Sequence, residues 1–215
     1  MQRLRIRFTR GEEVKYISHL DITRLWQRAF QRADVPLSYS QGFNPHPQIS
    51  LAVPLPVGVT SQAELMDALC TRFVSPHYFT TSVNRELPRG IEILQVYNIA
   101  LTLPSLQSQV SFTEYTVSIE TEKGQEEIAA AINHLLSRKE LPWQHERDTG
   151  VRRYDLRALV DSIWLVSTLD GCCTVGMKLR SDSSGSGRPE QVSAALGFDC
   201  YPYRIHRTGL FLKTR

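Results

Sequence analysis

The chain opens with RLRIRFTRGEEVKYISHLDITRLWQRAFQRA (residues 3–33), in which two different periodicities follow one another. Over residues 3–8 arginine and apolar side chains alternate, and a period of two predicts a β-strand with one basic and one apolar face. From Ile22 onward the apolar residues recur three or four positions apart, which predicts an amphipathic helix. Ser18 and Asp21 stand three residues apart at its start, a spacing typical of a helix N-cap. We therefore expect a strand followed directly by a long helix.

The rest of the chain repeats this beginning. We expect strands at residues 49–53, 64–73 and 91–103, with a helix at 75–87 between the last two. In the second half we expect a strand at 112–120, a helix at 125–137, a hairpin at 163–179 around Asp170-Gly171, a helix from Pro189 and a last strand at 201–213. Both halves then have the order βαββαβ. This order predicts an α+β protein made of tandem ferredoxin-like domains with antiparallel sheets, at residues 1–105 and 106–215.

Composition limits the class of protein. The 215 residues are 41% hydrophobic and 22% charged, which is ordinary for a soluble globular chain. No apolar run approaches the roughly 18 residues of a membrane span, and the N-terminus lacks an apolar signal-peptide core. We expect a cytoplasmic protein without a membrane partner. The four cysteines form no CxxC pair, so we expect no metal site and no cofactor held by this chain, and reduced thiols instead.

The charge is unevenly distributed. Residues 1–48 contain eight Lys and Arg against four Asp and Glu, and residues 151–215 contain ten against six. Residues 101–150 reverse the balance, with four against eight. An excess of positive charge at both ends of the chain indicates a surface that binds a polyanion.

Arg3, Arg5 and Arg7 lie on one face of the first predicted strand. Three guanidinium groups on one sheet face need water or anions beside them. Two interpretations remain open here. The face could contact RNA, as sheets of ferredoxin-like domains often do, or it could form a salt-bridge network with the acidic segment 114–148.

Two polar segments of the first half carry candidate binding residues. The first, at residues 18–21, begins a helix, where free main-chain N–H groups and the helix dipole favour an anion. The second, SYSQGFNPHP (residues 38–47), holds a histidine between two prolines, so its backbone has little freedom left to lose on binding. We expect the two segments to converge in one cleft edged by cations. The candidate residues are Ser18, His19, Asp21, Arg24, Arg28, Ser40, Gln41, Asn44 and His46.

Each of these residues also has a purely structural interpretation. Residues 18–21 could only cap the helix, and the arginines of the helix could form an ordinary solvated face. The polar loop could hydrogen-bond only to itself through Asx-type turns.

Arg157 and Arg188 are the candidate binding residues of the second half. Arg188 follows Gly185-Ser186-Gly187 and precedes a predicted helix, an arrangement that suits an anion but also suits a plain surface turn. The chain lacks GxGxxG and GxxxxGK[ST], which argues against nucleotide hydrolysis by a known phosphate loop. It also lacks a GxSxG elbow, so nothing supports a serine hydrolase.

Several of these segments together resemble a known family. Residues 16–21, 39–47 and 54–58, with Arg24, Arg28, Ala29 and Pro36, are similar to the N-terminal signature of the radical SAM-linked protein family, a bacterial domain of unknown function. Residues 155–157, 187–189 and 207–208 resemble its weaker C-terminal signatures, although Ala158 stands where a proline is usual. In that family the domain is fused to a radical SAM module or paired with one. The resemblance therefore implies a radical SAM protein as partner, and it implies no catalytic residues.

Three functions are compatible with these features. The first is a non-catalytic accessory module that binds RNA or presents a substrate to a radical SAM enzyme. The second is a metal-independent RNA endonuclease of the Cas6 kind, in which His19 and His46 share acid–base work and Arg24 or Arg28 stabilises the charge that develops. The third is an adaptor that binds only proteins.

Overall fold

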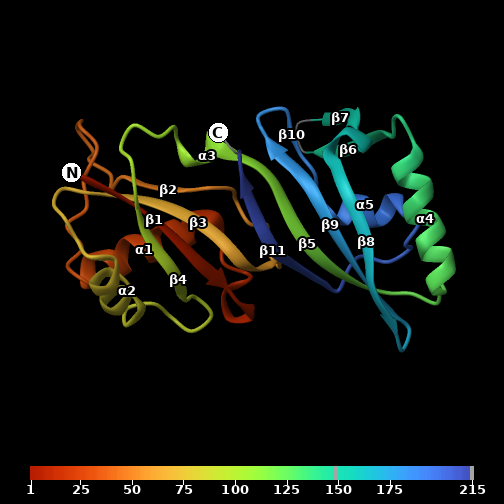
Figure 1. Cartoon of the computed structure of the whole chain (residues 1–215), viewed down its shortest axis with the longest axis horizontal. Helices are drawn as coiled ribbons and strands as arrows, with labels where there is room; N and C mark the ends of the chain where they lie inside the picture. The colour runs from red at the N-terminus through yellow and green to blue at the C-terminus, as the bar shows by residue number, and fades with distance from the viewer. Residues whose placement is uncertain (148–149, 214–215) are drawn as a thin grey trace. The chain divides into compact units, whose positions relative to one another are not determined.

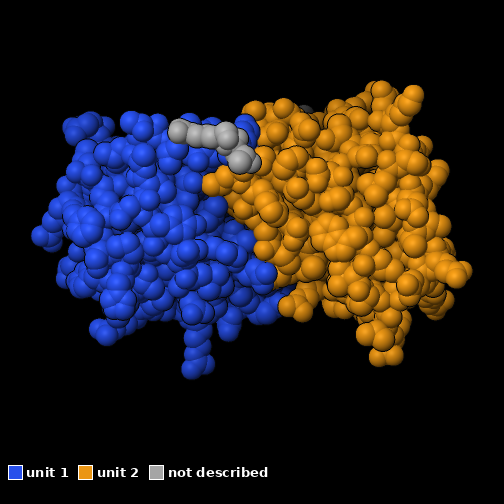
Figure 2. Space-filling view, in the orientation of Figure 1, with its two compact units in different colours: residues 1–110, 213–215 blue, residues 111–212 orange. Residues whose placement is uncertain are grey.

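The first strand and the first long helix lie where the two periodicities predict them. β1 covers Gln2–Arg10 and α1 covers His19–Arg32, with the short 3-10 turn η1 (Glu12–Val14) between them. The computed structural model describes residues 1–147 and 150–213. The chain divides into two compact units, residues 1–110 with 213–215 and residues 111–212 (Figure 1, Figure 2).

Unit 1 is an antiparallel sheet with helices on its apolar face. Hydrogen bonds join its strands in the order β4-β1-β3-β2. Buried residues of β1, α1 and α2 belong to one hydrophobic core. After α1 the elements of this unit are β2 (Ile49–Leu51), β3 (Thr60–Cys70), α2 (Pro76–Asn84), β4 (Ile93–Ile99) and α3 (Leu106–Gln109).

Aromatic rings fill the core of unit 1. Phe8 from β1 meets Trp26 from α1 edge to face, with ring centroids 4.8 Å apart. Trp26 lies 5.3 Å from Phe30, and Phe30 lies 5.4 Å from Phe79 of α2. Edge-to-face and tilted pairs at these separations add to the stabilisation from burial. This cluster fixes α1 on the sheet and leaves its opposite side to solvent.

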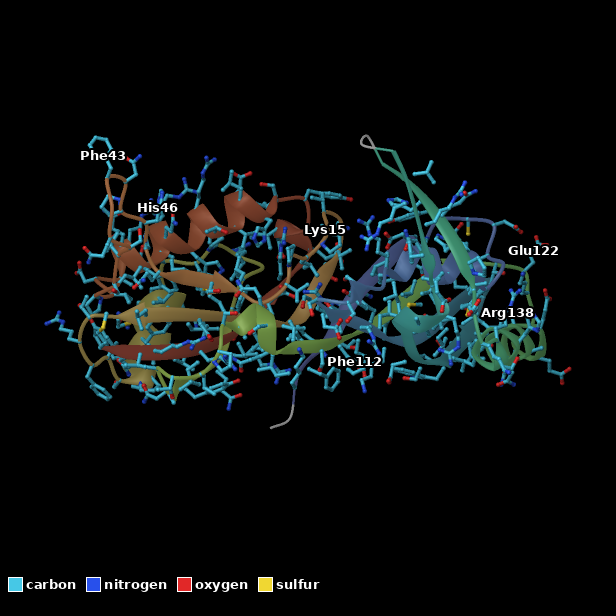
Figure 3. All side chains as sticks on the ribbon, turned by 90° about the horizontal axis from the view of Figure 1, so that it is seen from above. Lys15, Phe43, His46, Phe112, Glu122 and Arg138 are labelled. Atoms are coloured by element: carbon cyan, nitrogen blue, oxygen red, sulfur yellow. The ribbon has the colours of Figure 1, made fainter. Side chains whose placement is uncertain are left out.

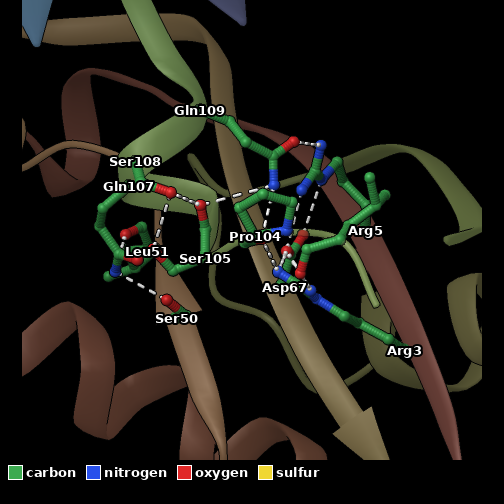
Figure 4. Close-up of polar contacts among 11 residues, drawn as sticks. Arg3, Arg5, Ser50, Leu51, Asp67, Pro104, Ser105, Gln107, Ser108 and Gln109 are labelled. Atoms are coloured by element: carbon green, nitrogen blue, oxygen red, sulfur yellow. Dashed lines mark hydrogen bonds and ion pairs between the residues drawn. The ribbon is translucent and has the colours of Figure 1, made fainter. Parts of the chain in front are cut away.

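For Arg3 and Arg5 of β1, the structure corrects both interpretations drawn from the sequence. Arg5 donates to Asp67 of β3 from Nε at 2.8 Å and from Nη2 at 3.0 Å, and Arg3 Nη2 lies 2.7 Å from the same carboxylate. Arg5 is 5% exposed and Asp67 is 4% exposed. Figure 4 shows Arg3 and Arg5 around Asp67. Arg3 also donates to the carbonyl of Leu103 at 2.6 Å. These two guanidinium groups are therefore occupied within unit 1, neither free for RNA nor paired with the segment 114–148.

Unit 2 has the strand order β11-β5-β9-β8, with β10 paired to the end of β9. A separate two-stranded sheet, β6 with β7, belongs to the same unit. The elements of unit 2 are β5 (Val110–Glu120), α4 (Gln125–Ser137), β6 (Pro142–Arg147), β7 (Gly150–Asp155), η2 (Arg157–Leu159), β8 (Val160–Leu169), β9 (Cys172–Asp182), β10 (Gly185–Ser186), α5 (Pro189–Ala195) and β11 (Arg204–Leu212).

The predicted α+β class with mostly antiparallel sheets is confirmed. The helix predicted at residues 125–137 and the hairpin around Asp170-Gly171 are present as α4 and as β8–β9. The β6–β7 hairpin was not predicted, because its strands are polar and show no alternation. Within the described ranges, no helix combines the length and the apolar character that crossing a bilayer requires.

The four cysteines should react with thiol reagents at very different rates. Cys70 and Cys173 are buried, and burial raises the pKa of both thiols, whereas Cys200 is exposed. The thiolate is the reactive form, so an accessible thiol is modified before a buried thiol whose pKa is raised. We expect Ellman's reagent to label Cys200 first, Cys172 more slowly, and the buried pair only in denaturant. Peptide mapping by mass spectrometry checks the order, and rapid labelling of Cys70 in the native protein would contradict the packing of β3.

Candidate functional site

The first turn of α1 is capped as the sequence predicts. The hydroxyl of Ser18 accepts a hydrogen bond from the N–H of Asp21 at 3.2 Å and donates to Asp21 Oδ2 at 2.7 Å. His19 is the first residue of the helix and is exposed, and its ring has no hydrogen-bond partner among residues 1–147 and 150–213. Ser18 and Asp21 therefore build the helix end, while His19 is available at the surface.

Next to this turn, Tyr16 extends the exposed surface, and Lys15 is half-buried beside it. Lys15 Nζ lies 2.7 Å from Glu12 Oε2 and 5.1 Å from the centroid of the Tyr16 ring. The hydrogen bond that Lys15 donates to the Glu12 carboxylate raises the pKa of Lys15. Tyr16 is 73% exposed.

The outer face of α1 carries a row of arginines. Arg24, Arg28 and Arg32 are exposed and stand four residues apart, so they lie on one side of the helix. Arg24 makes a weak contact of 3.5 Å with Asp21 Oδ1. Arg28 and Arg32 have no ion-pair partner in the described part of the chain. Since guanidinium groups stay protonated, the row is a permanent line of positive charge.

The polar loop is closed by its own backbone and by Ser40. Tyr39 pairs with Pro47 at the base, Ser40 N–H donates to the carbonyl of His46 at 2.9 Å, and the N–H of His46 donates to Ser40 Oγ at 3.0 Å. Gly42 has φ of +136°, a conformation that other residues rarely adopt. Ser40 is thus a structural residue of the loop. Gln41, Asn44 and His46 are exposed and have no side-chain hydrogen bond within the described residues.

An aromatic residue at the loop tip is a feature that the sequence reasoning missed. Phe43 is 101% exposed, and Tyr39 at the base is 51% exposed. A hollow of about 510 Å³ lies beside Tyr39 at the C-terminal end of α1, and Gln31 and Arg72 line it. A signal was present, because a phenylalanine between Gly and Asn in a polar segment has no apolar neighbours with which to form a core.

The expected convergence of the two polar segments is wrong. His19 begins α1, whereas the loop follows the C-terminal end of that helix and is hydrogen-bonded to the end of β3 through Ser38. Figure 3 shows Lys15 and His46 beside opposite ends of α1. Fourteen helical residues span about 20 Å, so one small ligand cannot contact both histidines. We call the exposed side of α1 (residues 19–32) together with residues 39–46 the α1–loop surface, which is elongated.

The two arginines predicted as binding residues in unit 2 differ in their surroundings. Arg157 donates to the carbonyl of Leu136 at 3.2 Å and to the carbonyl of Val160 at 2.7 Å, so it caps α4 and has a structural role. Arg188 is exposed and lies at a hydrogen-bonding distance of 3.4 Å from His145 Nε2. Only the second is placed to meet a ligand.

A family model described as "Uncharacterized protein conserved in bacteria (DUF2344)" matches residues 3–189 of the chain. The chain belongs to this family. The DUF2344 match includes all of the α1–loop surface and ends just after Arg188. No curated protein matches the chain.

Two of the solved structures that are similar to this DUF2344 protein have low identity to it. One is a chain of a Cbf5–Nop10–Gar1 complex, with a TM-score of 0.51 and 9% identity, covering 95% of this chain. Another is a chain of an archaeal box H/ACA sRNP Nop10–Cbf5 complex, with a TM-score of 0.47, 10% identity and 95% coverage. The DUF2344 chain spans about half of these relatives, 48% and 46% of their lengths. At this identity the likeness concerns the fold alone.

Proposed function

We propose that this chain is a non-catalytic accessory module that binds single-stranded RNA on its α1–loop surface and works with a radical SAM enzyme. The observation that carries RNA binding is the row of exposed arginines on α1 beside a loop with an exposed phenylalanine. Proteins that bind single strands combine a cationic track for the phosphates with aromatic side chains on which bases stack. The α1–loop surface has both parts.

The fold is compatible with this role. The four main strands of each unit, counted along the chain, lie in the order fourth-first-third-second. They are β4-β1-β3-β2 in unit 1 and β11-β5-β9-β8 in unit 2. This is the arrangement of a βαββαβ unit with its two helices on one face. We infer that each unit is a ferredoxin-like domain, and the predicted domains 1–105 and 106–215 remain our assignment. In such domains the sheet often contacts RNA, whereas here we assign the contact to α1 and the loop, because Arg3 and Arg5 are paired with Asp67.

The nuclease is the weaker candidate. Acid–base catalysis needs both groups within hydrogen-bonding reach of the reacting atoms, and His19 and His46 stand beside opposite ends of α1. We expect RNA to be bound and left intact when the protein is incubated with it in EDTA. If the RNA were cleaved, and if the His46→Ala variant no longer cleaved it, the accessory role would be wrong and the chain would be a nuclease.

The partnership with a radical SAM enzyme rests on the sequence signatures at residues 16–21 and 39–47. A pull-down with the tagged full chain from native cells, with RNA and protein both identified, tests it. Recovery of a radical SAM protein supports the accessory role. Recovery of RNA without such a protein would leave an RNA-binding protein that acts alone, and recovery of protein partners without RNA would favour the adaptor.

The Phe43→Ala variant should bind single-stranded RNA more weakly without any loss of stability. Stacking of one base on an aromatic side chain contributes about 1–3 kcal/mol, which corresponds to roughly 5- to 150-fold in affinity. The ring is fully exposed, so its removal costs the fold nothing. Fluorescence anisotropy with a labelled oligoribonucleotide measures the affinity. Tyr203→Ala is the control, because this ring in unit 2 is 58% exposed and lies outside the surface. Equal affinities of the Phe43→Ala variant and the wild type would contradict stacking at the loop tip.

A further inference from the structure

Unit 2 contains a cavity of about 220 Å³ that the α1–loop surface does not include. Its walls come from the β6–β7 hairpin, from the turn that contains β10 and from the first turn of α5. Figure 1 places β6, β7 and β10 side by side in this unit. We call it the β7–α5 cavity.

One side-chain amide of the β7–α5 cavity has a donor without a partner among the described residues. Gln191 lines the cavity and is 6% exposed. The hydroxyl of Tyr154 donates to Gln191 Oε1, which fixes the amide so that its Nε2 is the group left without a hydrogen bond among the described residues. Burial raises the pKa of Tyr154, so this phenol keeps the proton that it donates. Within the cavity this Nε2 can donate to an acceptor on a ligand.

Two arginines place positive charge in the β7–α5 cavity. The Arg152 guanidinium lies 5.7 Å from the centroid of the Tyr154 ring and has no ion pair within the described ranges. Arg188 lies 3.4 Å from His145 Nε2 and 3.9 Å from Glu190 Oε1, so its charge is only partly balanced. Guanidinium groups bind phosphate oxygens through paired N–H donors.

One acceptor in the β7–α5 cavity limits the choice of ligand. Asp155 also lines it, and its Oδ1 already accepts the N–H groups of Leu141 and Arg157. A carboxylate disfavours a bare anion but accepts hydrogen bonds from hydroxyl groups. A ligand that satisfies all these groups carries a phosphate for the arginines and Gln191 and hydroxyls for Asp155. The volume is below the roughly 300–1,000 Å³ of pockets for drug-sized molecules, so the ligand is small or enters only in part.

We propose that the β7–α5 cavity binds the phosphate and ribose of a nucleoside monophosphate. Its source is either a free nucleotide or the 5′-phosphorylated end of an RNA. This site is separate from the α1–loop surface, and it stands whether or not that surface binds RNA.

The test is calorimetric titration of the full chain with AMP, with adenosine as the ligand that lacks phosphate. We expect AMP to bind and adenosine to bind at least about tenfold more weakly, since charge-assisted hydrogen bonds to phosphate are lost. Arg152→Gln and Gln191→Glu should each weaken AMP binding by about tenfold or more. Gln191→Glu keeps the acceptor for Tyr154 but replaces the free donor by a negative charge. Arg152 is exposed, so its variant folds even if the buried Gln191→Glu does not.

Arg153→Gln is the matched control, because this neighbouring exposed arginine of β7 does not line the cavity. Equal binding of AMP and adenosine, equal losses in the Arg152→Gln and Arg153→Gln variants, or no AMP binding at millimolar concentration would each overturn the proposal. Competition of a 5′-phosphorylated oligoribonucleotide with AMP would identify the RNA end as the source. If AMP binds but the oligonucleotide does not compete with it, the ligand of the cavity is a free nucleotide.

Discussion

Replacement of Arg24, Arg28 and Arg32 together by glutamine is expected to lower the affinity for single-stranded RNA about a hundredfold at about 0.1 M salt. Each phosphate contact on a single strand contributes about 0.7 to the slope of log affinity against log salt concentration, so three contacts contribute about 2. At about 0.1 M salt, one decade below the 1 M reference, this slope corresponds to about two decades of affinity. The slope itself should become shallower by about 2 units. Anisotropy titrations at several salt concentrations measure both quantities.

A second triple variant separates this local effect from a loss of overall charge. Arg85, Arg89 and Arg138 are also exposed and lie outside the α1–loop surface. Their replacement by glutamine removes the same charge and should leave the affinity within about threefold, because screening limits the reach of exposed charges to roughly 10 Å at 0.1 M salt. Equal losses in the two triple variants would mean that RNA binding is diffuse and that the row on α1 has no special role.

The largest expected effect on stability comes from Asp67→Asn. This carboxylate is 4% exposed and is the shared partner of Arg3 and Arg5. Removal of one partner from a buried ion pair leaves an uncompensated charge and typically costs about 3–5 kcal/mol. We expect the free energy of unfolding, measured by urea denaturation, to fall by that amount. Followed by far-UV circular dichroism, the unfolding transition of the variant should have its midpoint at a lower urea concentration.

Asp161→Asn provides the comparison on an exposed pair. Asp161 lies 3.3 Å from Lys178, and the side chain of Asp161 is 37% exposed. Pairs of this kind contribute at most about 1 kcal/mol. If Asp67→Asn cost no more than Asp161→Asn, the arginine face of β1 would not be held by the buried cluster, and Arg3 and Arg5 could again be considered for RNA.

The sequence was most informative where a local period decides the structure. The alternation in β1 and the apolar spacing of α1 reflect burial on one face, and Phe8 and Trp26 are indeed in contact. The Asp170-Gly171 turn is equally local, and the hairpin there is confirmed. In each case the residues that decide the structure are close together in the chain.

Long-range pairing could not be derived in the same way. The partner of Arg5 is Asp67, and only the register between β1 and β3 sets them opposite one another. The two polar segments were expected to meet because both are polar and follow apolar stretches, but α1 separates them by its full length. The free amide of Gln191 depends on what lies around it in space, which the sequence does not reveal. The exposed ring of Phe43 did have a local signal, since its neighbours in the chain are polar.

The most direct test of the central claim is ultraviolet cross-linking of single-stranded RNA to the protein, followed by mass spectrometry of the cross-linked peptides. The account predicts cross-links at Tyr39 or Phe43, competed by unlabelled RNA and reduced in the Arg24, Arg28 and Arg32 triple variant. Specific cross-links confined to residues 111–212, or none that unlabelled RNA displaces, would contradict it.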